Sequence, residues 1–157
     1  MNSSAAKFRK RIYGLPEQAA RVCLVCPDFK YSIRNGELVG TGSMQPTPTC
    51  CCYRFRLRYR IGKNPKLWIL DPALRCRDDQ SNIPHTYRQD EPCVFRPGVD
   101  WSDEKILAST VIPWLAMWLM YYEFWHATGE WLGGGEHPEV PTDSNETDHQ
   151  SDEEEIS

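Results

Sequence analysis

The segment from Tyr53 to Ile61 constrains the fold of this chain more than any other. Its sequence, YRFRLRYRI, has an apolar or aromatic residue at every odd position and an arginine at every even position. Successive side chains of a β-strand point to opposite faces of the sheet, so this period of two predicts a strand with one apolar and one basic face. The apolar face must be buried, so the other face of the sheet is expected to present Arg54, Arg56, Arg58 and Arg60.

Further strands are predicted on either side of this segment. Asn35-Gly36, a pair typical of tight hairpin turns, separates the extended runs FKYSIR and ELVGTGSM. The apolar run LWIL at residues 67–70 indicates a fourth, more deeply buried strand that ends at Asp71-Pro72. We therefore expect a four-stranded antiparallel meander.

Helices are predicted before and after the meander. Residues 3–24 have an interrupted helical pattern, in which Pro16 suits the first turn of the second part and Pro27 ends it. After the meander, Ser102 can cap a long helix that is bent or restarted at Pro113. Gly129 and then the glycine run at 133–135 are expected to end this helix. The expected class is α+β: an N-terminal helix, the meander, an irregular loop and a long C-terminal helix, with the helices on one side of the sheet.

The acidic residues are concentrated at the C-terminal end, so the formal net charge of −4 hides a basic body. From Glu136 onward there is no aromatic residue, lysine or arginine, and such a segment buries too little apolar surface to offset its ordering entropy. A chain of 157 residues has the length of one domain. We expect a folded domain over residues 1–137 and a disordered acidic tail over residues 138–157.

The most apolar stretch, residues 106–125, has the length of a membrane span but contains Pro113 and Glu123. We therefore expect this stretch to form a buried core helix, and we do not expect the protein to bind a membrane. The N-terminus has basic residues but no apolar run behind them, which does not fit a secretory leader. We expect a cytoplasmic protein with reduced thiols, and seven cysteines, an odd number, fit poorly with a complete disulfide framework.

Six of the seven cysteines offer weaker cases for chemistry than the seventh. Cys23 and Cys26 have the spacing of half a zinc site, and the run Cys50–Cys52 could supply the rest. Neighbours in a strand point to opposite faces, so this run is poor ligand geometry. We expect no metal, with Cys23 and Cys26 packed in a helix and Cys51 facing the core. A small zinc-binding structural protein stays open as an alternative. Cys76 lies between two arginines that could favour its thiolate.

The seventh cysteine, Cys93, lies in a stretch without periodicity that extends from residue 72 to residue 97. So long an irregular stretch in a compact domain is usually functional or disordered. Pro92 stiffens the approach to the cysteine, the apolar pair after it can anchor the loop, and His85 lies eight residues upstream. From these residues alone, both a nucleophilic thiol and a packed filler remain possible.

The order of motifs in the second half of the chain resembles that of ubiquitin-conjugating enzymes. In those enzymes a four-stranded meander is followed by a His-Pro-Asn motif, a cysteine, a tryptophan and a long helix. Here PHTY, EPCVF and VDW, which begin at residues 84, 91 and 99, occupy these places. The later segment PWLAMWLMYYEFWHATGEWLGGGEHP closely resembles a bacterial branch, the conjugating-enzyme-like proteins of short type II operons for cyclic-oligonucleotide-based antiphage signalling (CBASS). The resemblance covers roughly residues 25–137.

This resemblance implies a catalytic cysteine, Cys93, that takes the C-terminus of a cGAS-like nucleotidyltransferase as a thioester and passes it to an amine. It also implies that His85 is a catalytic-site residue, which either has a structural role or polarises the loop. It implies no cofactor. PHTY departs from the family pattern, because Thr86 or Tyr87 stands near the place of the asparagine that supports the oxyanion. The short operons lack a separate activating enzyme, and the acceptor of conjugation stays unknown.

An acidic surface of the protein partner is the expected ligand of the basic strand face, which comprises Arg54, Arg56, Arg58 and Arg60. With no aromatic side chain expected on that face to stack bases, nucleic acid is not expected. A solvated face without a ligand is the simpler interpretation. The tryptophans at 114, 118, 125 and 131 are expected in the core. A non-catalytic binding module of the same fold remains the alternative to an enzyme.

Overall fold

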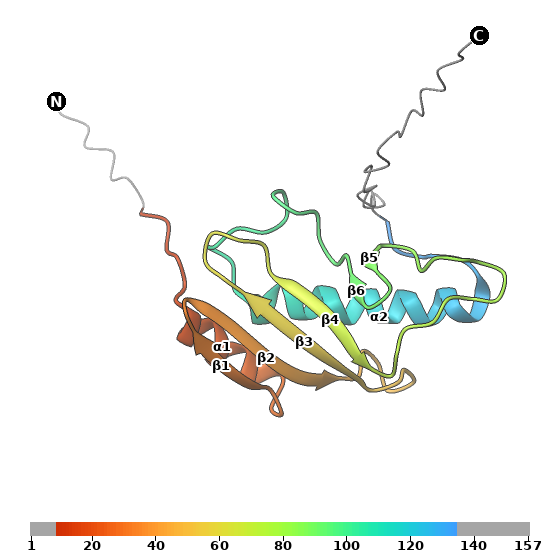
Figure 1. Cartoon of the computed structure of the whole chain (residues 1–157), viewed down its shortest axis with the longest axis horizontal. Helices are drawn as coiled ribbons and strands as arrows, with labels where there is room; N and C mark the ends of the chain where they lie inside the picture. Colours follow the sequence, from red (N-terminus) through yellow and green to blue (C-terminus); the bar gives the residue numbers. More distant parts are fainter. Residues whose placement is uncertain (1–8, 135–157) are drawn as a thin grey trace, which may run out of the picture.

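The computed structural model describes residues 9–134, and Figure 1 shows a twisted sheet with a long helix across it. Residues 9–14, which the sequence predicted as the end of the first helical part, are not helical. The earlier residues of that part and the predicted acidic tail lie outside the described residues. In chain order the elements are α1 (Leu15–Val25), β1 (Lys30–Arg34), β2 (Glu37–Met44), β3 (Tyr53–Tyr59), β4 (Lys66–Asp71), β5 (Thr86–Arg88), β6 (Glu91–Pro92), the 3₁₀ turn η1 (Leu107–Ser109) and α2 (Val111–Thr128). The predicted α+β order is confirmed.

The four long strands form an antiparallel sheet in the order β1-β2-β3-β4, which is the predicted meander. Asn35 and Gly36 join β1 to β2 with positive φ angles of 51° and 71°, the conformation that a two-residue hairpin turn requires. The alternation in β3 is also confirmed, because every odd residue from Tyr53 to Tyr59 is buried and every arginine between them is exposed. Burying one large apolar side chain is worth about 1.5–3 kcal/mol, so this pattern fixes which face of β3 meets the core.

The core forms where the buried face of the sheet meets α2. Phe55 and Leu57 of β3 and Leu115 and Leu119 of α2 are completely buried members of one apolar cluster. Within residues 9–134, no helix is long and apolar enough to cross a membrane. The predicted buried helix is therefore present as α2.

The second helix begins at Val111 and not at Ser102, so the predicted start is wrong. Asp103 is used elsewhere: its carboxylate accepts hydrogen bonds from the Tyr59 hydroxyl at 2.7 Å and from the Gly62 amide at 2.9 Å. These bonds tie residues after 102 to the end of β3 and compete with helix formation. Pro113 then lies in the first turn of α2, where its missing amide hydrogen leaves no helical bond unmade.

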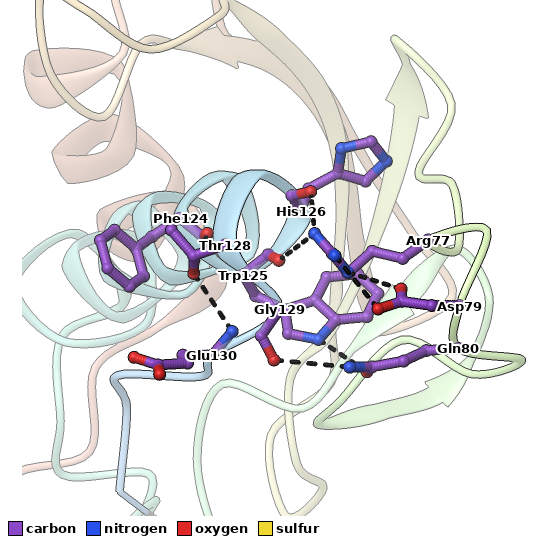
Figure 2. Close-up of polar contacts among 9 residues, drawn as sticks. All are labelled: Arg77, Asp79, Gln80, Phe124, Trp125, His126, Thr128, Gly129 and Glu130. Carbon is purple, nitrogen blue, oxygen red and sulfur yellow. Dashed lines mark hydrogen bonds and ion pairs between the residues drawn. The ribbon is translucent and has the colours of Figure 1, made fainter.

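The C-terminal end of α2 is held by the loop around Arg77 (Figure 2). Gly129 ends the helix with a φ of 85°, as a C-terminal glycine commonly does. The Trp125 carbonyl accepts from the Gly129 amide at 2.7 Å, and the Arg77 guanidinium donates to this carbonyl and to that of His126 in the last turn of the helix. Gln80 accepts from the Trp125 indole and donates to the Gly129 carbonyl (Figure 2). These contacts fix the direction in which the chain leaves α2.

Candidate active site around Cys93

Cys93 lies directly after a small β-hairpin that sequence periodicity did not reveal. Strands β5 and β6 pair with each other and separate His85 from Cys93, whose amide donates to the His85 carbonyl at 2.8 Å. The hairpin also joins the main sheet, since the Ile69 amide donates to the Asp90 carbonyl. Strands of three and two residues are too short to give an alternating pattern, which is why the stretch looked irregular.

The sulfur of Cys93 is half-buried and has two polar partners. Its Sγ lies 3.2 Å from the Tyr87 hydroxyl and 3.4 Å from the Phe95 carbonyl oxygen. Burial raises the pKa of the Cys93 thiol, and the Tyr87 hydroxyl acts in the opposite direction. The negative charge of Asp100 adds to the upward shift of this pKa. The sulfur is therefore held in place and mainly protonated until a reaction draws on its thiolate.

Cys93 borders a narrow cavity of about 160 Å³, which we call the thiol pocket. Aromatic side chains from α2 and from the chain beyond it form much of its wall. The lining includes Trp114, Met117, Trp118, Tyr121, Trp131 and Gly133. The prediction that all four tryptophans are core residues is only half right. Trp118 and Trp125 are buried, whereas Trp114 and Trp131 are partly exposed and line this pocket.

The chain after α2 forms one wall of the thiol pocket because it packs closely against that helix. At Gly133, an added Cβ would lie 2.7 Å from the Trp131 indole nitrogen and 2.8 Å from the Tyr121 ring. Only glycine allows so close an approach without a shift of these neighbours. The glycine run was predicted to end a helix, and its contact with the pocket was missed.

His85 contributes to the site mainly through its backbone. The residue is buried with 8% of its surface exposed, and its φ of 51° lies in the left-handed region. Its carbonyl accepts both the Cys93 amide and the Trp118 indole N–H, the latter at 2.9 Å. Its ring packs on Trp131 with 5.0 Å between centroids and borders the thiol pocket. The structure thus brings His85 and Cys93 together.

The sequence singled out Tyr87 only because it lies near the place of the family's asparagine. In the structure its hydroxyl lies next to the Cys93 sulfur. Tyr87 extends from β5 and also borders a second, larger cavity of about 560 Å³. That cavity lies between the turn before β4 and the loop after Cys93, and its lining includes Pro65, Leu67, Arg88 and Phe95. The only signal in the sequence was the position of this tyrosine six residues before the cysteine.

The other cysteines differ from Cys93 in their surroundings. Cys26 is buried, and burial raises its pKa to about 11, while Cys23 is half-buried near the Phe29 carbonyl. Cys51 was predicted to face the core and is exposed instead, because β3 begins only at Tyr53. Among residues 9–134, no group of three or more His, Cys, Asp or Glu side chains could hold a metal ion. The zinc alternative therefore has no ligand set in this part of the chain.

Cys76 was predicted to have a thiolate favoured by the arginines on either side of it. The structure turns one of these arginines away from that role, because Arg77 pairs with Asp79 and with the end of α2. The Cys76 sulfur itself lies 3.2 Å from the Ser81 carbonyl oxygen, which accepts its hydrogen.

The four arginines do not lie at the thiol. Arg54, Arg56 and Arg58 of β3 and the adjacent Arg60 are exposed on the face of the sheet opposite to the core. Arg58 forms an ion pair with Glu37 of β2. Residues directly opposite in paired strands point to the same side, so Arg56 and its partner Trp68 of β4 share this face. The expectation that the face has no aromatic side chain is therefore wrong, because it considered β3 alone.

A comparison with protein families finds one match over most of the chain. A family model described as E2-CBASS, Type II CBASS E2 protein, matches residues 18–138. This range includes the sheet, the hairpin with Cys93 and all of α2. No curated protein matches the chain.

Proposed function

This chain belongs to the family of type II CBASS E2 proteins, and we propose that it is an acyl carrier whose nucleophile is Cys93. The observation that supports this proposal best is the setting of the sulfur. It has a fixed hydrogen-bonding partner, lies on a pre-formed loop and borders a cavity. A nucleophile that receives the end of another chain needs such a fixed position and an open approach.

The proposed reaction consists of two acyl transfers on the sulfur. In the first, the Cys93 thiolate attacks the carbonyl carbon of the partner's C-terminal residue, and the C–S bond forms as the leaving group departs. A free carboxylate is a poor acyl donor, so the C-terminus has to arrive activated, as an acyl adenylate or another thioester. In the second, an amine attacks the thioester, the amide forms, the C–S bond breaks and the thiolate departs. The attacking nitrogen loses its proton to water or to a base.

The thiol pocket suits the first of these transfers. Its volume of about 160 Å³ is small, and its walls are rigid aromatic rings from α2 and from the segment after it. A small, largely apolar hollow beside the sulfur can hold the end of a chain, and a bound chain end would restrict water around the sulfur. A thioester that meets less water survives longer, so that an amine can compete with hydrolysis.

The partner in this proposal is a cGAS-like nucleotidyltransferase, whose C-terminus is the acyl group. The type II CBASS assignment supports a role in antiphage signalling. We propose that Arg54, Arg56, Arg58 and Arg60 bind an acidic surface of this partner. These side chains lie on the face of the sheet away from α2, so they would hold the partner without occupying the approach to the thiol.

A non-catalytic binding module is the second candidate function. The raised pKa of Cys93 favours it, since a resting thiol reacts more slowly than a thiolate. Reactivity of this one thiol distinguishes the two candidates.

The test supplies the nucleotidyltransferase of the same operon with its C-terminus activated as a thioester. The wild-type chain is expected to form a covalent adduct that a thiol reductant removes, and Cys93→Ala is expected to form none. Cys52→Ala is the matched control, because it removes an exposed thiol away from the pocket. Equal adduct formation by wild type and Cys93→Ala would contradict the proposal.

A further inference from the structure

Tyr87 places a phenol hydroxyl at the reacting atom of the proposed enzyme. Its Oη lies 3.2 Å from Cys93 Sγ, and the β5–β6 hairpin that carries it also holds the backbone of Cys93. The side chain is half-buried and borders the larger cavity, so its ring is packed while its hydroxyl meets the sulfur. A hydroxyl in this position can accept from the thiol or donate to the thiolate.

We propose that Tyr87 is a catalytic residue that stabilises the Cys93 thiolate by donating its hydroxyl hydrogen to the sulfur. The inference rests on the proposed function, because it assigns Tyr87 a part in the same acyl transfers. In the resting state the thiol hydrogen points toward the Tyr87 or Phe95 oxygen. When the thiol proton leaves to solvent, the hydroxyl rotates and donates to the negative sulfur.

The charges around the sulfur explain why a donor is needed there. Burial disfavours the thiolate, and the carboxylate of Asp100 disfavours it further. The other titratable groups are His85 and Tyr121 on the thiol pocket and Lys66, Arg88 and Glu91 on the larger cavity. A neutral phenol offsets part of these effects without introducing a charge into a half-buried site.

Tyr87 keeps its proton throughout the proposed cycle. Burial raises the pKa of the Tyr87 hydroxyl above its ordinary value, and the contact with Cys93 raises it further. The hydroxyl is thus a donor at every pH at which the protein works and is not an acid that exchanges its proton. The hydroxyl stabilises the negative sulfur in two steps: when the thiolate attacks the activated acyl group, and when it departs from the thioester.

The test measures the rate of Cys93 alkylation by iodoacetamide against pH, read by mass spectrometry of the peptide that contains Cys93. Tyr87→Phe is expected to move the midpoint upward by roughly one pH unit and to slow the reaction at neutral pH about tenfold. Tyr31→Phe is the matched control, because it removes the same hydroxyl from an exposed residue on β1 and should leave the profile unchanged.

A second variant makes the test independent of any change in packing. A single ring fluorine on Tyr87 (3-fluorotyrosine) nearly keeps the size of the side chain, makes the hydroxyl a stronger donor and leaves it protonated, so it should move the midpoint downward. An unchanged midpoint in both Tyr87 variants would overturn the inference. Adduct formation separates this failure from that of the proposed function. If wild type forms no adduct, the acyl-carrier function fails, even where the Tyr87 variants shift the thiol as expected.

Discussion

The backbone amide of Cys93 donates to the carbonyl of His85 at 2.8 Å, so the two residues are joined through their main chains. The same carbonyl also accepts from the Trp118 indole, which ties the cysteine loop to α2. The position of the thiol therefore depends on the backbone conformation of His85, whose φ is positive. A structural role of His85 would therefore depend on its main chain, whereas a catalytic role would depend on its imidazole ring.

His85→Asn is expected to keep adduct formation within about threefold of wild type. Asparagine adopts the left-handed conformation readily, so the carbonyl would stay in place. Loss of the ring packed on Trp131 should lower the free energy of unfolding by about 0.5–1.5 kcal/mol. A general base contributes typically about 10²–10⁴-fold, so a loss of that size in a single-turnover assay would mean that the imidazole itself takes part.

Gly133→Ala is expected to disturb the thiol pocket from outside the cysteine loop. The new Cβ would overlap the Trp131 indole and the Tyr121 ring, and such overpacking costs about 1–3 kcal/mol of stability. We expect a lower melting temperature and slower adduct formation. Gly14→Ala is the control, since an added Cβ there comes no closer than 3.8 Å to its nearest neighbour and Gly14 does not line the pocket. Similar behaviour of the two variants would show that the segment after α2 does not shape the pocket.

Reversal of two arginines tests the partner-binding surface. Arg54→Glu with Arg56→Glu leaves the Arg58–Glu37 pair intact and should weaken binding of the nucleotidyltransferase at least tenfold in a titration. The wild-type complex should also weaken with salt, because exposed charges are screened. Arg9→Glu with Arg75→Glu makes the same change in net charge at two exposed residues outside β3. Equal loss in both double variants would mean that only net charge matters.

Cys26 makes stability depend on pH in the alkaline range. Burial raises the pKa of the folded thiol to about 11, whereas an unfolded cysteine titrates near pH 8.5. The folded state therefore holds this proton more tightly, and the stability that it confers is present below about pH 8.5 and lost as the pH rises toward 11. Urea titrations at pH 8 and 10.5 should show a fall about 2 kcal/mol larger in wild type than in Cys26→Ala. Equal falls would contradict the assignment to this thiol.

The fold could be predicted where the sequence carries a local pattern. The alternation in β3, the Asn35-Gly36 turn and Gly129 at the end of α2 each depend on neighbours in the chain, and each is confirmed. The start of α2 could not be predicted, because Asp103 forms bonds to Tyr59 and Gly62 that are distant in sequence.

The candidate site was predictable only in part for the same reason. Cys93 and His85 were found by motif order, and the structure brings them together. The wall formed by Trp131 and Gly133 depends on how the chain leaves α2, which the loop around Arg77 decides. Trp68 on the basic face likewise came from a neighbouring strand, which no reading of β3 alone could include.

The central claim is that an acyl group is carried on residue 93, and Cys93→Lys tests it most directly. A lysine at this position would convert the labile thioester into an amide that resists reductants. With the C-terminus of the nucleotidyltransferase supplied in activated form, this variant is expected to give a stable adduct whose mass equals the sum of both unactivated chains less one water. Tandem mass spectrometry should place the bond between the C-terminus of the partner and residue 93. Absence of that bond from a folded Cys93→Lys protein, together with full antiphage protection by Cys93→Ala, would contradict the account.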